Sequence, residues 1–365
     1  MNRFTIFVSL FLTFSAATIS AADWPVCRGD ARSSGIASCE IRNAPEIKWA
    51  FAAEKDIFEA TPVIADGMVF LGSITGNFYA LELKTGKVVW KFFTKLGFSG
   101  PAAVSGGRVF VGDADGFFHA FDAKTGKEIW KKEIAGPMNA APGVFKNRVL
   151  FTVESGELYC LDADTGEEIW KYTSTDQLQC GITIRGTSVL LGGCDKSVQV
   201  VDVENGKLLR RLDVDAQTGA TVAVNEDENA FLGTMGAEVI AFSPKDEVLW
   251  RYMPEERKGP FRSNAAVTRE KIYVGGQNRR LVCLDAKTGG ELWAFTTRRN
   301  ADISPVVAGE HVLFYALEGK VFLLNADTGE EIWQEEVGGT LAAGPAVADG
   351  KFIVATGQGE VFCFE

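Results

Sequence analysis

The chain has 365 residues, of which 46% are hydrophobic and 23% charged, and this globular composition excludes collagen-like, coiled-coil and largely disordered proteins. With 37 Lys and Arg against 48 Asp and Glu, the net charge is −11. Nonspecific nucleic-acid binding depends on neutralising phosphates, so we expect no nucleic-acid partner for so acidic a chain.

Residues 1–22 have the pattern of a secretory signal peptide. Arg3 precedes a short apolar run, and small residues suit cleavage before Asp23. The run is too short for a permanent membrane-spanning helix, so we expect no transmembrane segment in the mature chain. The sequence therefore predicts export to the periplasm or the exterior by way of a cleaved signal peptide.

Residues 23–45 are predicted to form an N-terminal extension outside the repeats that follow. Cys27 and Cys39 flank a glycine-containing part of this extension. Because exported proteins fold in an oxidising compartment, we expect a disulfide between these two cysteines.

From residue 46 to residue 365 the chain repeats a unit of about 40 residues. Each unit ends in a tryptophan, which follows an acidic residue and a Thr-Gly turn. In one unit Arg210 occupies the position of this tryptophan. The tryptophans are Trp49, Trp90, Trp130, Trp170, Trp250, Trp293 and Trp333. Their regular placement predicts structural packing between neighbouring units; the alternative is a stacking platform for sugars or bases.

Each unit reads as four short strands, which we name A to D. In the second unit these are 102–104, 108–112, 117–122 and 128–131, and Gly126 closes the C–D turn, where a tight hairpin favours positive φ. Repeated four-stranded units of this length predict a β-propeller.

The ring is predicted to hold eight blades in one domain, 46–365. The last unit ends without a strand D, whereas 46–51 resembles a strand D that has no unit of its own. Pairing of the two closes the ring and removes both sheet edges. The predicted fold is all-β, an eight-bladed propeller of four-stranded antiparallel blades closed by the N-terminal strand.

The repeat, seen for example at 121–130 and 161–170, resembles that of PQQ-type eight-bladed propellers. That family includes quinoprotein alcohol dehydrogenases and BamB-type outer-membrane assembly factors. The resemblance covers 46–365, and 23–29 is similar to the opening of many exported bacterial proteins with this repeat. It implies the fold but not one function, because the fold hosts both enzymes and scaffolds.

A quinoprotein of this family implies PQQ bound with calcium, and the sequence departs from that pattern. Many such enzymes carry two adjacent cysteines beneath the quinone, and none are adjacent here. Residues 113–116, Asp-Ala-Asp-Gly, lack the remaining ligands of a calcium loop and are predicted to form a B–C turn. His119 takes a strand-C position held by Tyr79 and Tyr159 in neighbouring units, which predicts packing. We therefore expect no catalytic residue, no metal and no cofactor.

The remaining cysteines fall into two groups. Cys180 and Cys194 lie at the same end of one predicted hairpin. The sequence therefore allows a cross-strand disulfide between them but does not decide whether it forms. Three others share one position of strand C that alternates with alanine, which predicts buried, inert thiols: Cys160, Cys283 and Cys363. No CxxC spacing occurs, so a cysteine metal site is not expected.

The D–A and B–C connections emerge on one face of the ring, and they carry the candidate binding residues. Cations gather in the long connector 251–262 and beside it, and aromatics lie in an earlier connector. The predicted binding residues are Arg251, Arg257, Lys258, Arg262, Arg279, Arg280, Arg298, Arg299, Phe92, Phe93 and Phe98. In an acidic protein such a cationic sector can steer an acidic partner; the alternative is an ordinary solvated surface. The opposite face is predicted to be generic solubilising surface.

The sequence thus favours a monomeric, non-enzymatic exported scaffold that binds a protein partner through this face, as the resemblance to BamB-type envelope assembly factors implies. It departs from a lipoprotein in having no cysteine at the cleavage point. Two alternatives stay open: a small PQQ-dependent dehydrogenase-like quinoprotein, and an extracellular propeller that binds an acidic glycan or small molecule.

Overall fold

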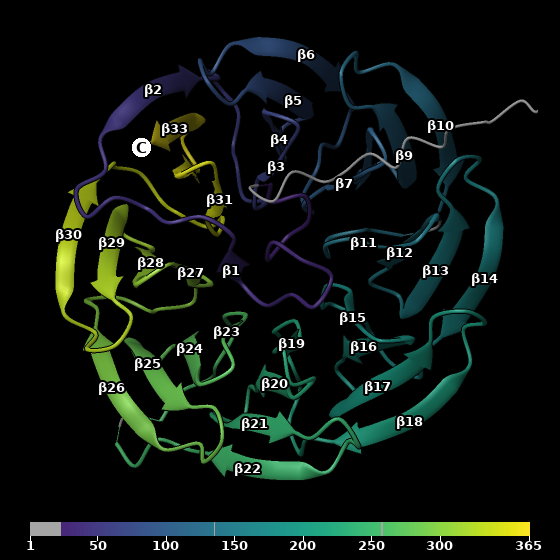
Figure 1. Cartoon of the computed structure of the whole chain (residues 1–365). Coiled ribbons are helices and arrows are strands. Elements are labelled where there is room, and N and C mark those ends of the chain that lie inside the picture. The colour runs from purple at the N-terminus through teal and green to yellow at the C-terminus, as the bar shows by residue number, and fades with distance from the viewer. Residues whose placement is uncertain (1–22, 135, 257) are drawn as a thin grey trace, which may run out of the picture.

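The structure is a computed structural model that describes residues 23–134, 136–256 and 258–365. Eight antiparallel sheets stand around a central axis in chain order, which confirms the predicted eight-bladed propeller (Figure 1). Within each blade the first strand is innermost and the fourth outermost. The confirmed fold includes closure of the ring by the N-terminal strand.

The strands of the blades have the following bounds. Blade 1 holds β3 (Val63–Ala65), β4 (Met68–Gly72), β5 (Asn77–Glu82) and β6 (Val88–Phe93); blade 2, β7 (Ala103–Ser105), β8 (Arg108–Gly112), β9 (Phe117–Asp122) and β10 (Glu128–Glu133); blade 3, β11 (Gly143–Phe145), β12 (Arg148–Thr152), β13 (Glu157–Asp162) and β14 (Glu168–Thr173); blade 4, β15 (Thr183–Arg185), β16 (Ser188–Gly192), β17 (Ser197–Asp202) and β18 (Leu208–Asp213). Blade 5 holds β19 (Ala223–Val224), β20 (Ala230–Gly233), β21 (Val239–Phe242) and β22 (Val248–Tyr252); blade 6, β23 (Ala266–Val267), β24 (Lys271–Gly275), β25 (Arg280–Asp285) and β26 (Glu291–Thr296); blade 7, β27 (Val306–Ala308), β28 (His311–Ala316), β29 (Lys320–Asn325) and β30 (Glu331–Glu336). Blade 8 holds β31 (Ala346–Ala348), β32 (Lys351–Ala355) and β33 (Glu360–Phe364), with β2 (Ile47–Ala52) as its outermost strand, and β1 (Ile36–Ala37) pairs with blade 7.

Burial within a blade follows its place in the ring. In blade 1 every residue of β4 is buried, whereas β6 alternates, with Trp90 buried between exposed neighbours. The middle strands are covered by the blades on both sides, and the outermost strand shows one face to solvent. The apolar core therefore lies between blades.

Each repeat tryptophan packs on the next blade. The Trp90 indole N–H donates a 2.8 Å hydrogen bond to the Ala123 carbonyl oxygen, and the ring packs against the backbone of Gly126. The same hydrogen bond runs from Trp49, Trp130, Trp170, Trp250 and Trp293 to the next blade. The tryptophan of one blade and the turn glycine of the next blade thus form a single inter-blade contact.

The N-terminal strand closes the ring. β2 pairs antiparallel with β33, with Trp49 opposite Cys363. The main chains of Glu46 and Glu365 exchange two hydrogen bonds of 3.0 Å. Blade 8 is therefore assembled from strands near both ends of the described chain.

The stretch before β2 runs over the axis of the ring, not outside it as expected (Figure 1). We call residues 24–37 the axial segment. β1, at its end, pairs parallel with β27. Its carbonyl oxygens accept hydrogen bonds from one backbone N–H of the innermost strand in each of six blades: Ile64, Val104, Ile184, Val224, Val267 and Val307. The axial segment is therefore hydrogen-bonded to the inner edges of six blades, and only β1, at its end, forms a strand.

Within residues 23–134, 136–256 and 258–365, the chain forms no helix with the length and apolar character needed to cross a membrane.

Candidate functional site

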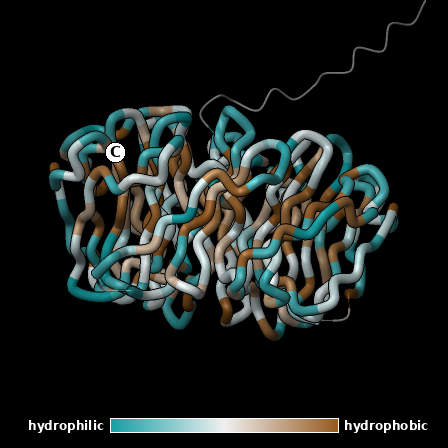
Figure 2. Tube along the Cα trace, turned by 90° about the horizontal axis from the view of Figure 1, so that it is seen from below, coloured by the Kyte–Doolittle hydropathy of each residue, from teal (hydrophilic) through white to brown (hydrophobic). Residues whose placement is uncertain are grey.

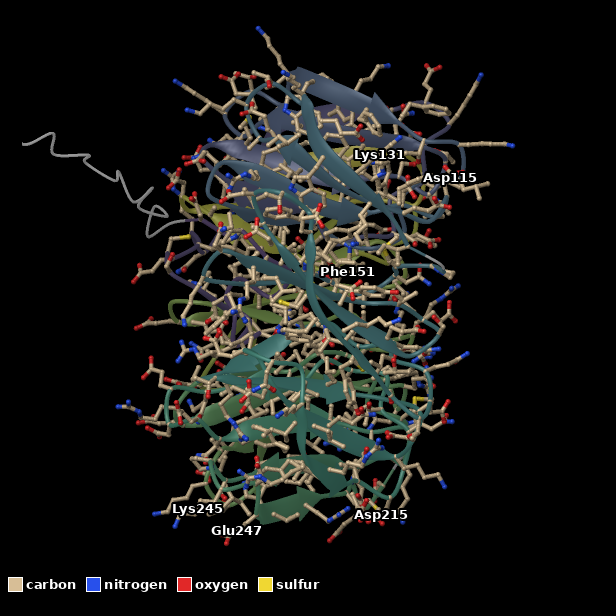
Figure 3. The ribbon with its side chains drawn as sticks, turned by 90° about the vertical axis from the view of Figure 1, so that its right-hand side faces the viewer. Asp115, Lys131, Phe151, Asp215, Lys245 and Glu247 are labelled. Atoms are coloured by element: carbon tan, nitrogen blue, oxygen red, sulfur yellow. The ribbon has the colours of Figure 1, made fainter. Side chains whose placement is uncertain are left out.

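The ring has two faces of different chemistry. We call the side with the D–A and B–C connections the loop face, and the side with the A–B and C–D turns the turn face. Viewed edge-on, Asp115 and Asp215 lie toward the loop face, and Lys245 and Glu247 lie away from it (Figure 3). Hydrophobic stretches occur at loop tips on the lower side of the tube, which is the loop face (Figure 2).

The predicted cations of the loop face separate into paired and unpaired groups. Arg251 binds Glu238 at 2.8 Å and Asp215 at 3.2 Å, and Arg280 binds Glu291 at 2.5 Å. The others are exposed and form no salt bridge with any described residue; we call them the cationic sector, and they are Lys258, Arg262, Arg279, Arg298 and Arg299. The predicted Arg257 lies outside the described residues.

Thr297 ties two parts of the cationic sector together. Its backbone N–H donates a 2.9 Å hydrogen bond to the carbonyl oxygen of Arg279 in the B–C turn of blade 6. Its buried hydroxyl donates to the Arg299 carbonyl oxygen at 2.6 Å. Arg279 also has φ 63°, a left-handed conformation that fixes the turn. The backbone therefore brings three arginines from two loops to one place, although their side chains remain exposed.

Only one of the three predicted aromatic contacts reaches the surface. Phe98 is fully buried against Phe78, with ring centroids 5.2 Å apart. Phe92 is half-buried on Phe121 at 4.7 Å. Phe93 is 64% exposed.

Other apolar side chains lie exposed in the loop-face connections. They are Leu96, 56% exposed, Met253, 42% exposed, and Met235, 37% exposed. The apolar part of this face therefore comes mainly from aliphatic and thioether side chains. Sequence reasoning missed them because it looked for aromatic residues.

His119 is buried, as its predicted packing role requires, and it is also held by two carboxylates. Its Nδ1 lies 2.8 Å from Glu128 Oε1 and its Nε2 lies 2.8 Å from Asp113 Oδ2. Asp113 also accepts the Phe117 backbone N–H at 2.8 Å, so 113–116 forms the predicted turn. No described hydroxyl or thiol bonds to the imidazole, and the arrangement has the character of a structural link.

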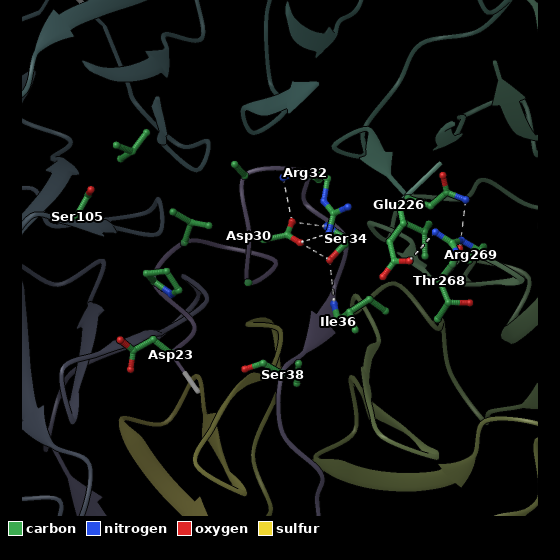
Figure 4. Close-up of a pocket in the computed structure, with 18 of the residues that line it drawn as sticks. Asp23, Asp30, Arg32, Ser34, Ile36, Ser38, Ser105, Glu226, Thr268 and Arg269 are labelled. Atoms are coloured by element: carbon green, nitrogen blue, oxygen red, sulfur yellow. Dashed lines mark hydrogen bonds and ion pairs between the residues drawn. The ribbon is translucent and has the colours of Figure 1, made fainter. Parts of the chain in front are cut away.

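The turn face contains a cavity of about 950 Å³ at the axis, above the axial segment (Figure 4). A–B turns from several blades form its rim. Asp30 folds the segment beneath it, accepting backbone N–H groups of Arg32 at 2.9 Å and Ser34 at 3.0 Å and the Ser34 hydroxyl at 2.7 Å. From the sequence, this face was expected to be generic solubilising surface. Gly29 and Gly35, both at positive φ, were the only signal of a tightly folded segment.

A buried cation lies beneath the cavity. The Arg28 side chain donates to the carbonyl oxygens of Ala265 at 3.1 Å and Pro305 at 2.6 Å, and the residue is 3% exposed. Burial lowers the pKa of Arg28 to about 10. Because a buried charge is costly without partners, these contacts fix the axial segment against blades 6 and 7.

The predicted disulfide between Cys27 and Cys39 is not formed, and neither is the Cys180–Cys194 disulfide that the sequence left open, because the structure holds all four as free thiols. The Cys39 sulfur instead accepts the Gly350 backbone N–H at 3.3 Å. Cys180 is buried beside Thr218, and burial raises the pKa of its thiol to about 12. The three cysteines predicted to be buried, Cys160, Cys283 and Cys363, are buried.

The residues present do not fit calcium-bound PQQ. The described part of the chain contains no group of three or more His, Cys, Asp or Glu side chains arranged to hold a metal ion. Calcium requires six to eight oxygen ligands, commonly from several carboxylates. The sequence also lacks the adjacent cysteines that the quinoprotein pattern implies.

Comparison with known proteins gives one family and two kinds of relative. The family model described as "Outer membrane protein assembly factor BamB" matches residues 119–246 and 235–364. Quinoprotein alcohol dehydrogenase PedH of Pseudomonas putida is 32% identical over 103 residues, 24% of this chain and 17% of the relative. Outer membrane protein assembly factor BamB of Burkholderia pseudomallei is 36% identical over 97 residues, 26% of this chain and 25% of the relative. The matches thus span a quarter or less of these relatives' length.

Solved structures show the same two kinds of protein. BamB from Moraxella catarrhalis superposes with a TM-score of 0.76 at 16% identity, covering 88% of this chain and 99% of that one. Quinohemoprotein alcohol dehydrogenase from Comamonas testosteroni superposes with a TM-score of 0.80 at 16% identity, covering 94% of this chain and 80% of that one. At these identities the likeness shows the fold alone.

Proposed function

Because the chain belongs to the PQQ-repeat propeller family described as outer membrane protein assembly factor BamB, we propose that it is an exported, non-enzymatic scaffold in envelope protein assembly, which binds a protein partner through the loop face. Under this proposal it works without PQQ, calcium or another cofactor. The partner presents an acidic surface with an apolar centre.

The observation that carries the proposal is the cationic sector. Its five side chains are exposed and form no salt bridge with a described residue, in a chain of net charge −11. The nearby Arg251 and Arg280, by contrast, are paired with carboxylates. Like charges held side by side repel one another, and an acidic partner relieves that repulsion. A complementary patch of this kind also speeds association, and it does so most strongly at low salt.

Exposed apolar residues of the same face supply the other half of an interface. Leu96, Met235 and Met253 lie in D–A or B–C connections, on a rigid ring. Apolar contact surrounded by charge is the usual anatomy of a protein interface, and flexible methionines adapt to a partner's shape. Loops on a rigid scaffold are also where binding function concentrates.

Cross-linking from defined positions tests the proposal. A photoreactive amino acid at Met253 samples the loop face, and one at Lys245, which is exposed on the turn side, is the matched control. With envelope extract we expect one protein, identified by mass spectrometry, to cross-link from position 253 and not from 245. The purified partner is then titrated against the wild type and the double variant Arg298→Glu, Arg299→Glu.

We expect the charge reversal to weaken binding at least tenfold, because it turns two attractive contacts into repulsive ones. Exposed Arg269 on the turn face provides the control, since Arg269→Glu also adds negative charge and should leave affinity unchanged. Equal labelling from both faces, or equal affinity of the double variant, contradicts the proposal. If an acidic polysaccharide such as polygalacturonate binds and no protein cross-links, the glycan-binding alternative replaces it.

A further inference from the structure

The central cavity of the turn face lies on the opposite side of the ring from the proposed interface. Its floor is the axial segment, and its rim includes the A–B turns of blades 2, 3, 5 and 6 (Figure 4). A volume of about 950 Å³ is at the upper end of the range of about 300–1,000 Å³ typical of ligand sites. The site is therefore large enough for a ligand of several residues.

The innermost strands of the blades share one binding geometry. In blade 2, Val104 stands opposite Val109 without using its N–H in the sheet, and that N–H donates a 2.7 Å hydrogen bond to the Pro25 carbonyl oxygen. Ile184 donates in the same way to Ala31 at 2.7 Å. In six blades the ring thus holds the axial segment through its main-chain carbonyl groups, although turns fold much of that segment.

Blade 3 has the same donor without an acceptor. Val144 stands opposite Val149 in the same register as Val104 opposite Val109, so its N–H also points toward the axis. It has no hydrogen-bond partner among the described residues, and Val144 is half-buried and lines the cavity. The counterpart in blade 8, Val347, is buried and does not line the cavity.

Three cations that line the cavity are each paired with a carboxylate. Arg32 pairs with Asp30 at 3.5 Å, and Arg269 pairs with Glu226 at 3.2 Å. Lys146 pairs with Glu204 at 2.7 Å. A charged ligand would have to compete with these pairs, whereas a main-chain carbonyl needs only the Val144 N–H. Recognition of a backbone is therefore favoured over recognition of an ion.

We propose that the cavity binds an extended peptide segment, one carbonyl oxygen of which accepts a hydrogen bond from the Val144 N–H. The peptide lies over the axial segment and adds to the inner edge of blade 3. This is β-augmentation, in which main-chain hydrogen bonds supply affinity. The site is independent of the cationic sector, so the protein offers one peptide site and one protein-docking face on opposite sides.

A capped peptide that copies residues 31–38, Ala-Arg-Ser-Ser-Gly-Ile-Ala-Ser, is the probe. Four of these residues already give carbonyl groups to the innermost strands within the protein: Ala31, Arg32, Ser34 and Gly35. Titration of ¹⁵N-labelled protein should shift the Val144 amide proton downfield in a saturable way. The amides that hold the axial segment should stay in place.

Variants at position 144 isolate the hydrogen bond. Val144→Pro removes the N–H, and an edge strand tolerates proline where that N–H is not used in the sheet. Val144→Ala keeps the N–H and is the matched control. We expect Val144→Pro to weaken peptide binding about fivefold or more relative to Val144→Ala, as for the loss of one hydrogen bond.

Several results would overturn the proposal. The first is equal affinity of the two variants, and the second is no binding of the probe at millimolar concentration. The third is amide shifts at Ile184 and Val267 in place of Val144, because such shifts would mean that the probe displaces the axial segment. If Val144→Pro does not fold, Ser105→Trp decides the matter. It narrows the cavity from the rim of blade 2 and should weaken binding, and unchanged affinity contradicts the site.

Discussion

At the scale of single residues, the repeat motif is explained by one contact. The turn glycine has φ near 70°, and its missing side chain makes room for the tryptophan of the preceding blade. A Cβ on Gly126 would lie 2.5 Å from the Trp90 ring, closer than such atoms approach. Glycine is thus required twice, for its backbone conformation and for the space that it leaves.

Two glycine substitutions separate these requirements. Gly126 and Gly107 have φ of 70° and 73°, but a Cβ on Gly107 would meet nothing within 4 Å. Alanine at either position strains the backbone, whereas only Gly126→Ala also pushes on a buried ring. We expect Gly126→Ala to lower the free energy of unfolding by about 1–3 kcal/mol more than Gly107→Ala does. Urea denaturation measures the difference, and equal loss in the two variants would show that the ring contact contributes nothing.

At the scale of elements, the stretch before blade 1 does two separate jobs. β2 completes blade 8, and the axial segment crosses the inner edges of the blades. β2 removes the exposed edge of β33, which would otherwise pair with other chains. The axial segment adds hydrogen bonds at the axis, but all eight blades keep their four strands when it is removed.

Two truncations distinguish these jobs. A chain starting at Glu46 loses the axial segment and keeps β2, and a chain starting at Ala53 loses both. We expect the first to remain a folded monomer with a lower melting temperature, since it loses the Arg28 contacts and the axial hydrogen bonds. The second should associate through the open edge of β33. Light scattering with thermal unfolding measures both, and a monomeric, equally stable second truncation would refute closure by β2.

At the scale of the whole molecule, periodicity explains what could be predicted from the sequence. Blade number, strand order and tryptophan packing all follow from residues that recur at fixed spacing. The axial segment has no repeat, and its place depends on Arg28 meeting carbonyl groups more than 200 residues away, which no local pattern encodes.

The same limit applies to the candidate site. Arg280 is neutralised by Glu291 on the neighbouring strand, while Arg279, one residue earlier, remains free of salt bridges among the described residues. Phe98 turns into the core after Gly97, at φ 84°, whereas Phe93 stays exposed. Loop residues carry no alternation from which burial could be deduced, so their exposure had to come from the structure.

Calorimetric titration of the mature protein with PQQ, with and without calcium, tests the central claim most directly. The two kinds of relative, BamB and quinoprotein dehydrogenases, share this fold. Only the dehydrogenases carry a quinone cofactor in their name. The scaffold account predicts no binding heat at high micromolar PQQ in either condition, because the described residues offer no cluster of three or more His, Cys, Asp or Glu side chains to hold the calcium ion. Tight, calcium-dependent binding would contradict the account and identify the protein as a quinoprotein.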